Sequence, residues 1–191
     1  GIINYSTATL TWLRDQLDLL SDAGESEQLA TSVEDNGGVY LVPAFAGLSA
    51  PHWNSEARAA VVGMSGHTTR AHVVRAALEA VAFQIDDVLT MIADEAGIPL
   101  QDAMADGGPT GNRFLMQFTA DITRLSWKVS EIAESSALGA AMAGMLGLEI
   151  YSSLDELAKL PREVTDYSPR MAPQQADRLR DEWHRAVKRV L

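Results

Sequence analysis

The sequence has 191 residues, of which 47% are apolar and 21% charged, and its formal net charge at pH 7 is −11. This composition is typical of an ordinary globular domain that can bury a core, and the strong negative charge argues against nucleic acid and anionic membranes as partners, because a surface of this sign repels their phosphates. The absence of cysteine excludes disulfides, thiolate metal ligands and a cysteine nucleophile, and it is consistent with a cytoplasmic protein.

Apolar periodicity, capping patterns and glycine or proline breaks define the expected elements. Because strands alternate with helices, they indicate an α/β or mixed domain. The chain begins without Met on what resembles the tail of a strand, so we expect it to be part of a longer protein. In chain order we expect helices at 9–20 and 26–33, a strand at 39–42, an apolar loop at 44–58, a strand at 59–64, a helix at 70–96, a strand at 103–105, a helix at 113–122, a strand at 126–129, helices at 137–144 and from 153, a polar connector at 161–173 and a helix at 174–190.

Two of these helices carry further expectations. Glu79 falls within the apolar stretch of the 70–96 helix, where it is either buried with a partner or placed at the rim of the buried face. The helix at 137–144 is made largely of glycine and alanine, and such small side chains imply the close approach of another element.

The segment 106–112, Asp-Gly-Gly-Pro-Thr-Gly-Asn, has the clearest chemical potential. It enters a predicted helix whose first amides lack intrahelical partners and carry the positive end of the helix dipole, which together make an anion site. Gly107 and Gly108 would let a phosphate or sugar approach the main chain, and Asn112 could cap the helix or bind a ligand. A purely structural turn is the alternative, and the sequence contains neither a P-loop nor a dinucleotide-binding fingerprint.

Other chemistry has little support in the sequence. No histidine pairs with a second histidine and a carboxylate at metal-ligand spacing, so we predict no metal site. No Gly-x-Ser-x-Gly elbow supports a serine hydrolase. Asp106 could reach a metal-bound phosphate, although such an aspartate more often satisfies turn amides. Because no residue stands out as a general base, we assign no catalytic residue to this chain. The histidines are His52, His67, His72 and His184.

Three ordered motifs resemble the FGGY family of carbohydrate kinases. Residues 59–64 followed by 72–79 resemble the family's second signature, residues 106–112 look like its adenosine-side nucleotide loop, and residues 137–141 look like its small-residue helix. Two further segments, 12–15 and 38–53, are similar to glycerol kinases in particular, and the whole resemblance extends from residue 6 to about residue 190.

The resemblance implies a ribonuclease-H-like α/β domain of the actin/Hsp70 type, with a mixed sheet flanked by helices and incomplete at its amino-terminal edge. Residues 1–191 would form the carboxy-terminal, nucleotide-binding domain. The amino-terminal substrate domain, with the catalytic aspartate and the first phosphate loop, would lie outside this chain. Gly108 and Asn112 would contact ATP or ADP, Gly107 would shape the loop, and the ligands of Mg²⁺ would also lie outside the chain.

The activity implied is ATP-dependent phosphoryl transfer to a polyol or sugar hydroxyl, with glycerol the first candidate substrate, by a cytoplasmic enzyme that could form a homodimer or homotetramer. This chain alone would be inactive. The alternative is a non-catalytic, actin-like module for nucleotide sensing or assembly. Thr7 and Thr11 favour that alternative, because they stand where glycerol kinases usually carry a glycine and a glutamine near ATP. Gly66-His67 is a second departure, in place of the usual Arg-Gly. An unrelated α/β domain with a structural Gly-Gly turn is the third interpretation.

Overall fold

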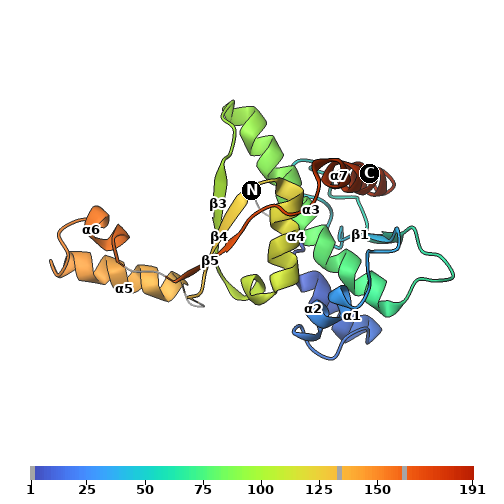
Figure 1. Cartoon of the computed structure of the whole chain (residues 1–191), viewed down its shortest axis with the longest axis horizontal. Coiled ribbons are helices and arrows are strands. Elements are labelled where there is room, and N and C mark those ends of the chain that lie inside the picture. The colour runs from blue at the N-terminus through green and yellow to red at the C-terminus, as the bar shows by residue number, and fades with distance from the viewer. Residues whose placement is uncertain (1–2, 133–134, 161–162) are drawn as a thin grey trace.

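The computed structural model describes residues 3–132, 135–160 and 163–191. A small hairpin, a three-stranded sheet and several helices surround one long central helix (Figure 1). No helix in the described ranges is both long and apolar enough to cross a membrane. The elements are α1 (Ala8–Leu17), α2 (Glu25–Thr31), β1 (Tyr40–Val42), β2 (Ala60–Val62), α3 (Arg70–Ala96), β3 (Asp102–Ala105), the 3-10 helix η1 (Gly108–Gly111), α4 (Arg113–Thr123), β4 (Ser126–Ser130), α5 (Ser135–Gly147), α6 (Leu154–Ala158), β5 (Val164–Tyr167) and α7 (Pro173–Val187).

The central helix α3 has the bounds that the sequence predicts. It starts after Thr69, whose amide donates to Nδ1 of His72 (3.1 Å), and it stops at Gly97, which adopts a left-handed conformation with φ 64°. Its 27 residues span about 40 Å. Because α2, α4 and β1 all pack on it, α3 fixes the relative positions of the elements that form the site described below.

The two sheets are separate. Strands β1 and β2 form an antiparallel hairpin in which Tyr40 lies opposite Val62. Gly63 follows β2 with φ 83°, and a Cβ there would lie 1.9 Å from the carbonyl oxygen of Gly38, so only glycine fits. In the other sheet the order is β3-β4-β5, with β3 parallel and β5 antiparallel to β4. This combination confirms the predicted mixed sheet.

Strand β5 shows that the predicted polar connector at 161–173 is wrong in part. Val164–Tyr167 pairs antiparallel with β4, and three of its four residues are exposed. Backbone hydrogen bonds to β4 hold this edge strand, so it lacks the buried apolar alternation by which a strand is recognised. Residues 161–162 of the predicted connector lie outside the described residues.

The first helix also ends earlier than predicted. The apolar spacing predicts a helix to residue 20, but α1 stops at Leu17 and Asp18 takes a left-handed conformation with φ 52°. Leu20 is nevertheless buried, at 4% exposure. The apolar spacing therefore predicts correctly that Leu20 is buried, but the prediction that it lies in the helix is wrong.

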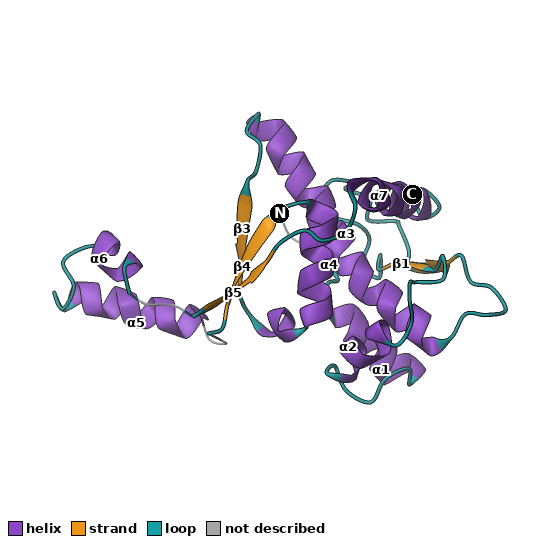
Figure 2. Ribbon diagram, viewed as in Figure 1, coloured by secondary structure: helices purple, strands orange, loops and turns teal. Residues whose placement is uncertain are grey.

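The small-residue helix α5 contradicts the expectation of a close neighbour. It has no buried residue among those described, and a Cβ built on Gly139 or Gly144 meets no atom within 4 Å. Together with α6 it projects from the end of the β3-β4-β5 sheet, away from the other helices (Figures 1 and 2). Small side chains therefore do not produce close packing for α5 within the described residues.

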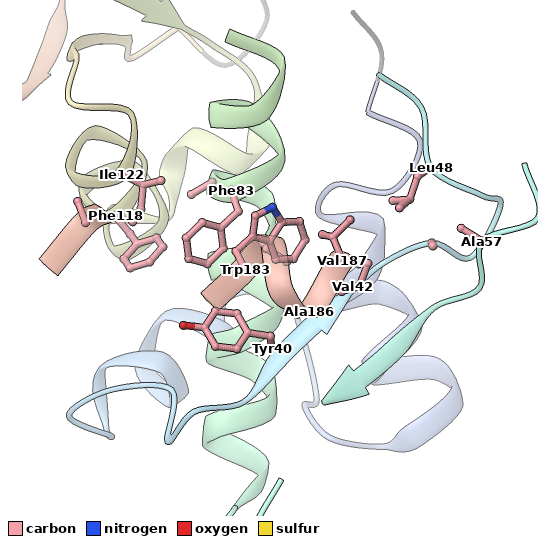
Figure 3. Packing of buried hydrophobic residues seen from close by; sticks show 14 residues of the cluster. Tyr40, Val42, Leu48, Ala57, Phe83, Phe118, Ile122, Trp183, Ala186 and Val187 are labelled. Atoms are coloured by element: carbon pink, nitrogen blue, oxygen red, sulfur yellow. The ribbon is translucent and has the colours of Figure 1, made fainter. Parts of the chain in front are cut away.

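Aromatic side chains from four elements form the centre of one core (Figure 3). Trp183 of α7 stacks on Phe83 of α3 with ring centroids 5.3 Å apart and an interplanar angle of 11°. Phe118 of α4 meets Phe83 edge-on at 5.6 Å, and Tyr40 of β1 lies 6.0 Å from it. These are favoured aromatic geometries, so the cluster joins α7 to α3 and α4.

Asp87 of α3 gives α7 a polar anchor beside this core. The indole Nε1 of Trp183 donates to its Oδ2 at 2.8 Å, and Nε2 of His184 lies 2.8 Å from its Oδ1. Nε2 of His52, from the 44–58 loop, lies 3.8 Å from Oδ2. Burial raises the pKa of Asp87, but hydrogen bonds, that from His184 foremost, outweigh burial and lower it to about 2. The same hydrogen bond raises the pKa of His184 above its ordinary 6.5.

The His184–Asp87 pair is expected to stabilise the fold in a pH-dependent way. Because the folded pKa of His184 is raised, its contribution is complete below pH 6.5 and is lost as the pH rises through the folded value. Asp87 contributes above its ordinary pKa of 3.8 and loses its contribution only as the pH falls through about 2. We expect His184→Gln to lower the melting temperature at about pH 6 and to have a smaller effect at about pH 9.

Thermal unfolding of the parent protein and of His184→Gln, between about pH 6 and about pH 9, measures the difference in melting temperature. His72→Gln is a useful control, because His72 also accepts a hydrogen bond, from the Thr69 amide at the start of α3, but makes no contact with Asp87. An effect of His184→Gln that grows with rising pH would contradict the pairing.

Candidate functional site

A hollow of about 370 Å³, called the α2–α4 pocket below, opens between α1, α2 and the turn before α4. Leu10, Leu78 and Leu115 give it an apolar floor. Its polar lining comes from three elements, since α1 and the residue before it supply two threonines, α2 supplies a serine and a carboxylate, and the turn supplies glycine main chain and an amide. These residues are Thr7, Thr11, Ser26, Glu27, Gly108 and Asn112.

The glycine turn places open main chain beside this pocket. Gly107 has φ 95°, a conformation that favours glycine, and a Cβ on Gly107 or Gly108 would meet no atom within 4 Å. Among the described residues no acceptor bonds the amides of either glycine, so both N–H groups can serve a ligand. Gly108 lines both the α2–α4 pocket and a second hollow beside β4, whereas Gly107 lines only the second hollow, together with Arg113.

Asn112 caps α4, as the sequence analysis allows. Its Oδ1 accepts a hydrogen bond from the amide of Leu115 at 2.9 Å, and its Nδ2 donates to Oγ of Ser26 at 3.2 Å. The first bond satisfies an amide of the first helical turn. The second uses one of the two Nδ2 hydrogens, so the side chain keeps a donor for a ligand while it faces the pocket.

Glu27 occupies part of the expected anion site at the start of α4. Its Oε2 accepts a hydrogen bond from the amide of Arg113 at 2.9 Å, and Asn112 occupies the amide of Leu115. An internal carboxylate thus already satisfies part of the positive end of this helix. Among the described residues, the amide of Phe114 in the first turn of α4 and the amides of Gly107 and Gly108, before that helix, have no hydrogen-bond acceptor.

Ser26 and Glu27 are pocket residues that the sequence analysis did not single out. They lie 86 positions before their partners Asn112 and Arg113, and both bonds join the start of α2 to the start of α4. A serine and a glutamate near the beginning of a short helix look like ordinary capping residues, so no local pattern could have identified this role.

A buried ion pair of α3, Arg75–Glu79, also contacts α2. Arg75 of α3 bonds Glu79 at 2.7 Å and donates to the carbonyl of Ala30 in α2 and to those of Val33 and Glu34 in the segment that follows α2. Its guanidinium also lies 5.0 Å from the ring centre of Phe114 in α4. Arg75 thus contacts both helices that form the walls of the α2–α4 pocket.

Glu79 is buried with partners, which is the first of the two alternatives that the sequence leaves open. The residue is 2% exposed, and Asn36 Nδ2 donates to its Oε2 at 2.8 Å. Burial raises the pKa of this carboxyl, while the hydrogen bonds from Arg75 and Asn36 oppose the rise.

The residues that the structure describes do not form a magnesium site by themselves. In the described part of the chain no three His, Asp or Glu side chains lie close enough together to hold a metal ion. Asp106 is an exposed carboxylate directly before Gly107. Since Mg²⁺ is commonly bound through one or two carboxylates, several waters and substrate phosphates, a single carboxylate is not a preformed site.

Comparison with known proteins gives a consistent result. The model of the carboxy-terminal domain of the FGGY family of carbohydrate kinases matches residues 1–148. Glycerol kinases of Koribacter versatilis and Dechloromonas aromatica are 42% and 46% identical over 190 and 191 residues, which is 100% of this chain and 38% of each relative. The chain therefore spans less than half the length of these curated relatives.

Solved structures agree with the sequence relatives. The crystal structure of Plasmodium falciparum glycerol kinase with ADP is 36% identical, with a TM-score of 0.91 over 100% of this chain and 38% of that one. Xylulose kinase from Rhodospirillum rubrum is 26% identical, with a TM-score of 0.78 over 97% of this chain and 38% of that one. These neighbours confirm the predicted actin/Hsp70-type fold, and the family match over most of the sequence shows that this chain belongs to the FGGY family of carbohydrate kinases.

Proposed function

We propose that the intact protein transfers the γ-phosphoryl group of ATP to a hydroxyl of a polyol or sugar, glycerol being the first candidate. Residues 1–191 would be its carboxy-terminal, nucleotide-binding domain. The observation that carries the proposal is the α2–α4 pocket, where an apolar floor meets the open main chain of Gly108 and the side chain of Asn112. The high similarity to a glycerol kinase solved with ADP supports a nucleotide as its occupant.

The pocket suits the nucleoside part of ATP or ADP. Leucine side chains offer an apolar surface to a base, while neutral hydroxyl and amide groups offer hydrogen bonds. The free amides of Gly107 and Gly108 lie at the edge of the pocket and would meet the phosphates. We therefore propose that the nucleotide lies across the glycine turn, with Gly107, Gly108 and Asn112 as its binding residues.

Catalysis itself would need groups that this chain does not offer in the pocket. Phosphoryl transfer uses Mg²⁺ to neutralise charge and an aspartate to accept the hydroxyl proton. The charged side chain that lines the α2–α4 pocket, Glu27, binds the Arg113 amide through Oε2 and is held as a cap of α4. We therefore propose that residues 1–191 alone do not phosphorylate glycerol or a sugar. Formation of a phosphorylated product by the isolated chain would contradict this.

Asn112→Ala in the intact protein is expected to weaken ADP binding about tenfold, because a hydrogen bond from the amide is lost. The same change should cost about 1 kcal/mol of stability through loss of the helix cap. Titration calorimetry and urea unfolding measure the two effects separately.

Asn112→Ser is the matched control, since serine is also a good cap but lacks the amide donor. Asn112→Ser should be as stable as the parent protein but should bind ADP as weakly as Asn112→Ala does. If both variants bind ADP like the parent protein, Asn112 is not a nucleotide contact.

The competing function is a non-catalytic module for nucleotide sensing or assembly whose loop no longer binds nucleotide. Thr7 and Thr11, which line the α2–α4 pocket, are the specific observation in its favour. Titration of the intact protein with ATP and Mg²⁺ separates the two functions, because saturable binding favours the kinase and its absence favours the module.

We also propose that the intact kinase is a cytoplasmic enzyme and that it forms a homodimer or homotetramer.

A further inference from the structure

The carboxylate of Glu27 is held in a defined orientation at the wall of the α2–α4 pocket. Its Oε2 is engaged by the Arg113 amide at 2.9 Å, and the residue is half-buried on α2. Among the described residues no donor bonds the other oxygen, Oε1. A carboxylate is an acceptor-only group, so this second oxygen is available to a ligand that donates hydrogen.

Glu27 also sets the charge of the pocket. It is the charged side chain among the described lining residues, and the other polar members are neutral threonines, a serine and an amide. The second hollow, on the side of Gly107, is lined by one cation, Arg113, and one carboxylate, Glu131, so it carries no comparable excess of negative charge. A phosphate would therefore be repelled by Glu27, whereas a neutral group with hydroxyl donors would be attracted.

We propose that Oε1 of Glu27 accepts a hydrogen bond from the ribose hydroxyls of the bound nucleotide, and thereby makes the pocket selective for ribonucleotides. This inference rests on the proposed nucleotide site. The ribose carries two neighbouring hydroxyls, and an acidic side chain that binds a ribose hydroxyl is a recurrent solution in nucleotide-binding proteins. The same charge directs the phosphates past Gly108 and out of the pocket, so Glu27 determines which end of the nucleotide enters.

The test uses the intact protein and three probes, namely ADP, 2′-deoxy-ADP and 3′-deoxy-ADP, with affinities measured by titration calorimetry. Because a hydrogen bond to a charged group is lost, we expect the protein to bind at least one deoxy analogue about tenfold more weakly than ADP. Glu27→Ala should bind ADP about as weakly as the parent protein binds that analogue, and should discriminate by no more than about twofold.

Two further variants exclude a purely structural explanation. Glu27→Gln keeps an amide oxygen for the Arg113 amide, so α4 stays capped, but it lacks the charge that strengthens the sugar contact, and its discrimination should fall below that of the parent. Gln28→Ala changes the next residue of α2, whose side chain is exposed and does not line the pocket, and it should discriminate like the parent protein.

The outcomes separate this inference from the proposed function. If the protein binds ADP and both deoxy analogues equally, or if Glu27→Ala keeps the discrimination, then Glu27 does not contact the ribose, while the nucleotide site stands. If ADP does not bind at all, the proposed function fails and the inference fails with it. Ribose selectivity that disappears in Glu27→Ala and persists in Gln28→Ala establishes the contact.

Discussion

Replacement of Trp183 by alanine is expected to lower the free energy of unfolding by about 4 kcal/mol. The side chain is 1% exposed and stacks on Phe83, so its removal leaves a large cavity between α7 and α3. The substitution also removes the indole donor of the 2.8 Å hydrogen bond to Asp87, whose buried carboxylate then loses a partner. Urea unfolding followed by circular dichroism measures the loss.

Trp183→Phe separates packing from hydrogen bonding. Phenylalanine retains much of the stacking area but has no N–H group, so we expect a smaller loss of about 1–2 kcal/mol. Leu191→Ala, at an exposed position near the same end of the chain, should change stability little. A loss below about 1 kcal/mol for Trp183→Ala would mean that α7 is not part of the cooperative core.

Replacement of Arg75 by methionine is expected to destabilise the fold by about 3–5 kcal/mol, because it leaves the buried carboxylate of Glu79 without its cation. The arginine side chain is only 14% exposed, and its guanidinium also bonds one carbonyl in the last turn of α2 and two in the segment that follows it. Loss of those bonds should loosen α2 and so weaken nucleotide binding at the opposite end of that helix. Unfolding and ADP titration on one variant test both effects.

A second substitution tests the cause of this destabilisation. Adding Glu79→Gln to Arg75→Met removes the uncompensated charge while keeping the shape and the contact with Asn36. The double variant should recover a large part of the lost stability. If it is no more stable than Arg75→Met alone, the arginine acts mainly through the α2 carbonyls rather than through Glu79.

The parts of this fold that follow from the sequence are those defined by local patterns. The bounds of α3 are predicted because an apolar stripe, a threonine before it and a glycine after it all act within a few residues. The cap made by Asn112 is predicted for the same reason. Strand β5 is missed because its pairing with β4 depends on backbone contacts with a segment that lies elsewhere in the sequence.

In the candidate site, too, features set by neighbouring residues are predicted, and features set by contacts between distant segments are not. The openness of Gly107 and Gly108 agrees with what a strand–glycine–helix sequence indicates. The roles of Ser26 and Glu27 depend on the packing of α2 against α4 across α3, which no spacing rule encodes. The expected anion site at α4 is partly occupied for this reason, since the carboxylate that binds the Arg113 amide comes from a distant helix.

The two hydrogen bonds between α2 and α4 join residues 86 positions apart, and this separation has a consequence for the order of folding. During synthesis α2 leaves the ribosome well before residues 112 and 113, so the wall it forms stays unpaired until α3 and the glycine turn have emerged. Contacts of such high sequence separation form slowly, because a long loop must close first. The proposed nucleotide site is therefore complete only in the late, nearly complete fold, and we expect its ligand to slow unfolding rather than to speed the first steps of collapse.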